Sequence, residues 1–125
     1  MQKIFLIAAS ISGALAVMIG AFGAHALRAT LEAAGRTETF ETAVKYQFYH
    51  SLALLAAGII CSFYQSRLLD YAGYCFIGGI LIFCGSLYIL ILSGVTKWGA
   101  VTPIGGLLFI AGWILMCISF FKMQG

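Results

Sequence analysis

Two histidines and their polar neighbours are the side chains most able to do chemistry, because they flank long apolar runs. His25 closes the first run, and Tyr46, Gln47 and His50 open the second. Tyr46 and Gln47 precede His50 by four and three residues, so the three share one side of a helix. If both runs cross a membrane in opposite directions, the first ends on the side where the second begins. We therefore expect His25 to join the other three in one polar cluster near a membrane surface.

Two kinds of role fit such a cluster. The imidazoles could ligate haem or a metal, hold a quinone or relay protons. Alternatively, they hydrogen-bond between helices and fix the fold, as we expect of Ser86 and Tyr88 in the third apolar run. A third metal ligand, a C-x-x-C-H motif and a nucleophile–base pair are all lacking, so we predict no metal site and rank an enzyme last. A structural or regulatory role comes first. Binding of a small molecule or a cofactor (haem or quinone) through His25 and His50 is the alternative.

The elements that must position these residues follow from composition and charge. Of 125 residues, 62% are hydrophobic and only 9% are charged. Four windows without Asp, Glu, Lys or Arg are each long enough to cross a bilayer as a helix. This excludes a soluble enzyme, a nucleic-acid-binding module and a secreted disulfide scaffold. We predict one all-α integral membrane domain over 1–125, an antiparallel bundle whose four transmembrane helices cover about 4–26, 46–64, 72–93 and 103–121.

The polar stretch after the first span predicts a short amphipathic helix on the membrane surface, over about 27–35. Its apolar residues recur at i, i+4 and i+7: Leu27, Leu31 and Ala34. Gly35 supplies the helix stop, and Thr37 is a plausible N-cap for a long second helix that starts near Glu38. On that helix Glu41 precedes Lys45 by four residues, a spacing that predicts an ion pair.

Small residues predict where the helices pack closely. In the first span they recur every four residues, at Ala8, Ser12, Ala16, Gly20 and Ala24. Such a stripe lets another backbone approach closely. In the last two spans, glycines recur at heptad spacing, at Gly78 and Gly85 and again at Gly105 and Gly112. We expect these four glycines to lie where the third and fourth spans meet.

Four segments together resemble a known family of small membrane proteins, catalogued as domain of unknown function 423. They are residues 20–27, which end at Ala26-Leu27 after His25, residues 43–54 around Tyr46 to His50, residues 85–88, and residues 102–113 from Thr102-Pro103 to Gly112-Trp113. The resemblance covers essentially the whole chain. It implies a four-helix, multi-pass protein of the bacterial inner (cell) membrane, and it brings no activity, substrate or cofactor. The expected partners are the lipid bilayer and either a second copy or another membrane protein, not nucleic acid.

Overall fold

The computed structural model describes residues 1–124, and every regular element in that part of the chain is helical. The elements in order are α1 (Gln2–Ala24), α2 (Arg28–Ala34), α3 (Thr37–Ile60), α4 (Arg67–Gly79), a π-helical turn η1 (Ile80–Cys84), α5 (Gly85–Ser93), a 3-10 turn η2 (Thr96–Ala100) and α6 (Thr102–Lys122). Because α4, η1 and α5 follow without a break, they form one long helix over Arg67–Ser93.

Three helical segments are long and apolar enough to cross a membrane: Gln2–Ala24, Arg67–Ser93 and Thr96–Lys122. The sequence predicted four spans, and α3 is the segment that does not qualify. It carries Lys45, Gln47 and His50, which lower its mean hydropathy. The membrane character of the fold therefore rests on three helices. Whether α3 also lies within the membrane depends on the partners with which its polar side chains form hydrogen bonds.

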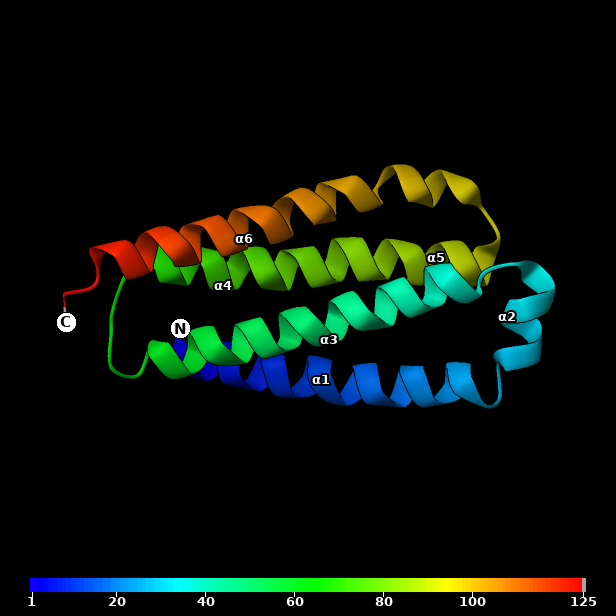
Figure 1. Cartoon of the computed structure of the whole chain (residues 1–125), viewed down its shortest axis with the longest axis horizontal. Coiled ribbons are helices and arrows are strands. Elements are labelled where there is room, and N and C mark those ends of the chain that lie inside the picture. The colour runs from blue at the N-terminus through cyan, green and yellow to red at the C-terminus, as the bar shows by residue number, and fades with distance from the viewer. Residues whose placement is uncertain (125) are drawn as a thin grey trace.

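The helices form two antiparallel hairpins that lie side by side (Figure 1). One hairpin pairs α1 with α3, and the other pairs the α4–α5 helix with α6. Helix α3 also contacts α4, η1 and α5, so it joins the two hairpins. The short helix α2 lies across the end of the bundle, transverse to the long helices (Figure 1).

The residues that begin and end the helices were predicted correctly from the sequence only in part. Gly35 ends α2 with a φ of 68°, a left-handed conformation that glycine adopts at low cost, so the predicted helix stop is confirmed. Gly94 ends α5 in the same way, with a φ of 71°. The predicted N-cap of α3 was wrong, since Arg36 is the N-cap and Thr37 is the first helical residue.

The π-helical turn sets the closest approach between the last two long helices. A Cβ atom on Gly105 of α6 would overlap the Phe83 backbone nitrogen in η1. Beside this contact, the Ser86 hydroxyl donates to the Phe83 carbonyl oxygen at 2.9 Å and lies 2.6 Å from the Thr102 hydroxyl. The expected helix-to-helix hydrogen bond of Ser86 is thus confirmed, and it joins α5 to the start of α6.

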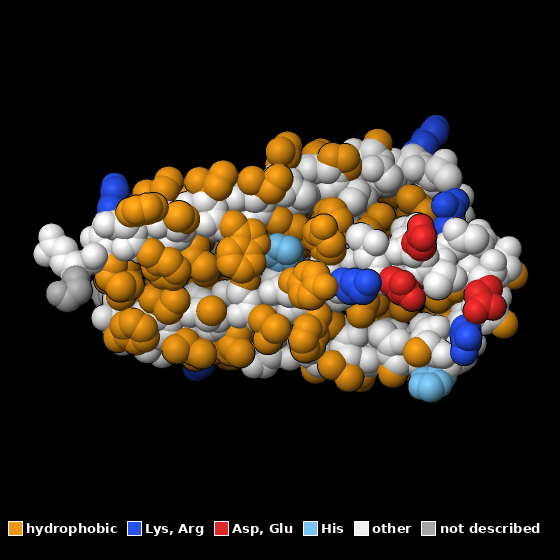
Figure 2. All heavy atoms as spheres, viewed as in Figure 1, with side chains coloured by type: hydrophobic (Ala, Val, Ile, Leu, Met, Phe, Trp, Pro, Cys, Tyr) orange, Lys and Arg blue, Asp and Glu red, His pale blue; other side chains and the backbone are white. Residues whose placement is uncertain are grey.

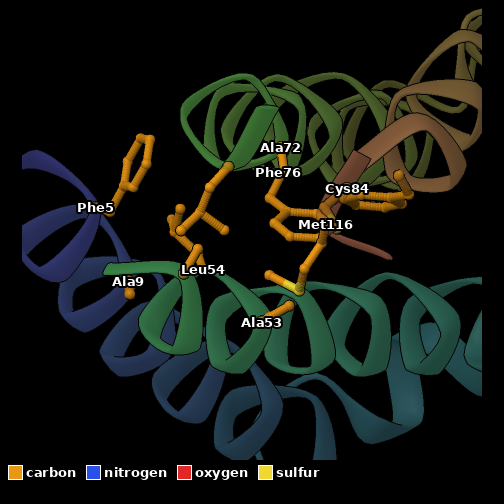
Figure 3. Packing of buried hydrophobic residues seen from close by; sticks show 11 residues of the cluster. Phe5, Ala9, Ala53, Leu54, Ala72, Phe76, Cys84 and Met116 are labelled. Atoms are coloured by element: carbon orange, nitrogen blue, oxygen red, sulfur yellow. The ribbon is translucent and has the colours of Figure 1, made fainter. Parts of the chain in front are cut away.

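The rest of the contact between α4 and α6 is formed by aromatic rings that pack against glycines. The Phe76 ring of α4 covers Gly112 of α6, and the Phe109 ring of α6 covers Gly79 of α4. Of the four glycines expected here, Gly105 and Gly112 lie at the contact, Gly78 lies beside Leu108, and Gly85 has open space around its Cβ position. Figure 3 shows the apolar core between the hairpins, where Phe76 and Met116 face Leu54 and Ala53 of α3.

The outer surface of the long helices is apolar. Figure 2 shows hydrophobic side chains over most of one face, with the acidic side chains and most of the basic ones in this view towards the α2 end. Large apolar side chains such as Leu92 and Phe121 are each 85% exposed. An exposed apolar surface of this extent marks contact with lipid or protein, not with water.

Candidate functional site

His50 is buried between α3 and α6, with both ring nitrogens in hydrogen bonds. Its Nδ1 atom lies 2.8 Å from the Tyr46 carbonyl oxygen, and Trp113 Nε1 donates to its Nε2 atom at 3.0 Å. A carbonyl only accepts and an indole N–H only donates, so the proton of a neutral ring lies on Nδ1. The imidazole is 6% exposed and keeps no free nitrogen for a ligand.

Aromatic rings surround this histidine and border a surface groove. The His50 ring stacks on Phe109 with 3.6 Å between centroids, and Tyr46 stacks on Phe83 at 4.8 Å. The groove has a volume of about 610 Å³ and lies between α3, η1 and α6. Tyr46 lies in the wall of this groove and is 39% exposed, so its ring contacts both the protein and the surroundings.

Gln47 points away from His50 and forms a second polar cluster. Its amide nitrogen donates to the Ser12 carbonyl oxygen of α1 at 2.9 Å, and its amide oxygen accepts from the Tyr88 hydroxyl of α5 at 2.7 Å. Ser51 extends the cluster, since its hydroxyl donates to the Gln47 carbonyl oxygen at 2.6 Å and lies 2.7 Å from the Ser12 hydroxyl. The Gln47 side chain, which is 4% exposed, therefore joins its own helix α3 to α1 and α5.

The sequence indicated part of this second cluster and missed the rest. The expected interhelical hydrogen bond of Tyr88 is confirmed. Ser51 was missed, although it lies one turn after Gln47 and could have been found from that spacing. Ser12 was assigned only to a packing stripe, and nothing in its spacing indicates that its carbonyl oxygen receives an amide.

The structure does not place His25 with the other three predicted residues. His25 caps the C-terminus of α1 and is exposed. Near it, the Cβ position of Gly23 meets the Phe40 ring of α3. His50 lies ten residues beyond Phe40, roughly 15 Å along the helix axis. The expectation failed because α3 pairs with α1 from its first turn, so three turns separate the levels of the two histidines.

The small-residue stripe of α1 lies mostly towards α3. Ala16 is 1% exposed, and a Cβ on Gly20 would lie 3.3 Å from the Val44 side chain. Ser12 makes the hydrogen bonds described above, and Ala8 is half-buried beside a groove between the hairpins. Ala24, at the end of the stripe, is exposed. The stripe thus gives close backbone approach over its middle part.

Six of the eleven charged residues lie from Arg28 to Lys45, on α2, at the N-cap of α3 and on the first part of α3. Among residues 1–124 the ion pair that forms is Arg28 with Glu32 on α2, at 3.2 Å between exposed side chains. Glu41 and Lys45 do not form the ion pair that their spacing predicted. In the same described part, no group of three His, Cys, Asp or Glu side chains is arranged to hold a metal ion.

Comparisons with known proteins agree with the membrane character of the helices. A family model described as a protein of unknown function, DUF423, matches residues 19–106. A UPF0382 membrane protein of Staphylococcus aureus is 44% identical over 124 residues, which cover 99% of this chain and all of the relative. A UPF0382 membrane protein of Staphylococcus saprophyticus is 46% identical over 122 residues, or 98% of this chain and all of the relative.

No solved structure matches the chain significantly. The relatives are bacterial membrane proteins by name, and three helices of this chain can span a membrane, so it is a small multi-pass protein of the bacterial membrane. The family match covers well over half of the chain, and the relatives match it along nearly its whole length. The chain therefore belongs to the DUF423 family of bacterial membrane proteins.

Proposed function

We propose that the protein is a four-span, non-catalytic structural component of the membrane, with α3 as the fourth span. The observation that carries this proposal is the internal use of the polar side chains of α3. Gln47 bonds to α1 and α5, and His50 bonds to α6. Lipid offers such groups no partners, so a polar helix can cross a bilayer when its neighbours satisfy it. With 24 residues, α3 is roughly 36 Å long, enough for a hydrocarbon core of about 30 Å.

The number of spans can be read from the position of the two termini. Four spans put both ends of the chain on the same side of the membrane, whereas three put them on opposite sides. We expect epitope tags at the two termini to be cut together by a protease added to spheroplasts, or protected together. A tag inserted after Gly35, in the turn that Gly35 closes, serves as the control and should behave in the opposite way. Tags on opposite sides would contradict the assignment of α3 as a span.

The hydrogen bonds also favour a structural role over ligand binding. Haem or metal ligation by His50 would have to displace either the Trp113 indole or the Tyr46 carbonyl from the ring. His25 lies about three helical turns from His50 along the bundle, so the two histidines cannot both be axial ligands of one haem. The two polar clusters instead join α3 to both helices of the second hairpin, α5 and α6. We infer that these side chains hold the two hairpins together inside the membrane.

Replacing either partner of the His50–Trp113 hydrogen bond tests this role. We expect Trp113→Phe and His50→Phe each to lower the free energy of unfolding by about 1 kcal/mol, since interhelical hydrogen bonds in membranes contribute amounts of this size. The double variant should lose less than the sum of the two, because both changes remove the same bond. Unfolding in detergent, followed by circular dichroism, measures the loss.

The control is Trp98→Phe, which changes the exposed tryptophan of η2 and should leave stability unchanged. Strictly additive losses would show that His50 and Trp113 act independently and would contradict the role. A visible absorption band in the purified protein that His25→Ala and His50→Ala both abolish, with the fold intact, would favour the alternative of a bound cofactor.

A further inference from the structure

A pocket of about 330 Å³ lies where α1, α2 and α3 meet, apart from both polar clusters. One wall is the last turn of α1, where Gly20, Gly23 and Ala24 have little or no side chain. Leu31 of α2 contributes a second apolar wall. On the α3 side, Phe40 and Val44 pack against Gly23 and Gly20 and complete an apolar lining that suits a hydrocarbon segment.

Two opposite charges complete the lining of this pocket. Glu41 and Lys45 lie one turn apart on α3, and both are exposed. An acid four residues before a lysine is the favourable order for an ion pair on a helix, yet the pair does not form here. On neighbouring α2 the same spacing does give an ion pair, between Arg28 and Glu32. The pocket thus presents an unpaired carboxylate and an unpaired ammonium beside apolar walls.

The position of the pocket matches the level of lipid headgroups. It lies beside the last turn of α1, the point at which that membrane-spanning helix ends. Helix α2 crosses the bundle at this end, as a helix on a membrane surface would (Figure 1). A molecule that occupies the pocket is therefore drawn from the lipid leaflet, with its charged part level with Glu41 and Lys45.

We propose that this pocket binds one phospholipid with a primary-amine headgroup, a phosphatidylethanolamine. Lys45 binds the phosphate, Glu41 accepts a hydrogen bond from the headgroup ammonium, and the α1 wall contacts the first part of an acyl chain. Charge-assisted hydrogen bonds of this kind are the strong ones. A quaternary ammonium has no N–H to donate to Glu41, and an anionic headgroup without an amine leaves that carboxylate unpaired beside a phosphate. The chemistry of the lining therefore favours the primary amine over both.

Lipid binding to the full-length protein, measured by native mass spectrometry after delipidation, tests the proposal. The probes are phosphatidylethanolamine, phosphatidylcholine and phosphatidylglycerol with identical acyl chains. We expect the first to bind about tenfold more tightly than the other two, the size of one charge-assisted hydrogen bond. Glu41→Gln should abolish this preference, and Lys45→Gln should weaken binding of all three lipids. Soluble glycerophosphoethanolamine should not compete, because it lacks the acyl chain.

Matched variants separate the pocket from general charge and packing effects. Glu38→Gln removes the same charge from the same helix outside the pocket, and it should keep the preference. Ala24→Phe fills the hollow and should weaken binding, whereas Ala21→Phe, also exposed on α1 but outside the pocket, should not. Equal binding of the three lipids, tighter binding of phosphatidylglycerol, competition by the soluble headgroup, or equal effects of Glu38→Gln and Glu41→Gln would each overturn the proposal. Because Glu41 and Lys45 are exposed, their variants report on binding even if Ala24→Phe fails to fold.

Discussion

Gly105→Ala is expected to destabilise the protein more than any other single-methyl change. The added Cβ would overlap the Phe83 backbone nitrogen and would lie 2.7 Å from the Phe83 Cα atom. A backbone cannot rotate away as the end of a side chain can, so α6 would have to move off the π-helical turn. Overpacking typically costs about 1–3 kcal/mol, and we expect a loss at or above the upper end of that range.

Gly85→Ala is the matched control for this prediction. Gly85 also lies in a membrane-spanning helix, but nothing lies within 4 Å of the Cβ position. Alanine is favoured over glycine in a helix by up to about 1 kcal/mol, so this variant should be as stable as the parent or more so. Unfolding in detergent, followed by circular dichroism, compares the two. Equal stability of both variants would show that the helices do not approach closely at Gly105.

Gln47→Leu is expected to have the second-largest effect. The change keeps a similar volume but removes the partners of the Ser12 carbonyl oxygen and the Tyr88 hydroxyl. Leaving a buried polar group unpaired costs about 1–3 kcal/mol. This cost applies to the Tyr88 hydroxyl, whereas the Ser12 carbonyl oxygen loses one of two bonds, because it lies inside α1 and keeps its helical hydrogen bond. We therefore expect a loss of about 2 kcal/mol or more in the same unfolding measurement.

Tyr88→Phe distinguishes this cause from a general packing defect. It removes the hydroxyl that Gln47 accepts from and keeps the ring. In the Gln47→Leu background that hydroxyl no longer has its partner, so removing it should cost less than in the parent protein. A cost that is the same in both backgrounds would mean that the two side chains do not interact.

The sequence predicted the helices well because their signals are local. Charge-free windows set the long helices, and the Gly35 stop follows from residues a few positions apart. The failure at His25 has a different origin. Apolar windows show where a helix is hydrophobic, but they do not show where it begins to pair with its neighbour. Since α3 pairs with α1 from its first turn, His50 lies further from the α2 end of the bundle than the window boundary indicates.

The glycine pattern was only partly informative for a related reason. Heptad spacing places Gly78 and Gly85 on one face only if the helix between them is regular. The π-helical turn Ile80–Cys84 lies between them and changes the rotation per residue, so Gly85 leaves the face that meets α6. Nothing in the apolar run from Ile80 to Cys84 predicts this turn. The predicted Gly105 and Gly112 do lie at the contact, since α6 is a regular helix.

The place where the chain crosses between the hairpins has a mechanical consequence. The single covalent link, the turn after Ile60, is at the end opposite α2 (Figure 1). The hydrogen bonds from Gln47 and His50 to the second hairpin leave α3 well before that turn. The two hairpins are therefore two arms with a hinge at the α3–α4 turn, and the hydrogen bonds from α3 hold these arms together further along their length. Because lipid can replace apolar contacts but not these hydrogen bonds, breaking the bonds would let the two arms separate at the α2 end.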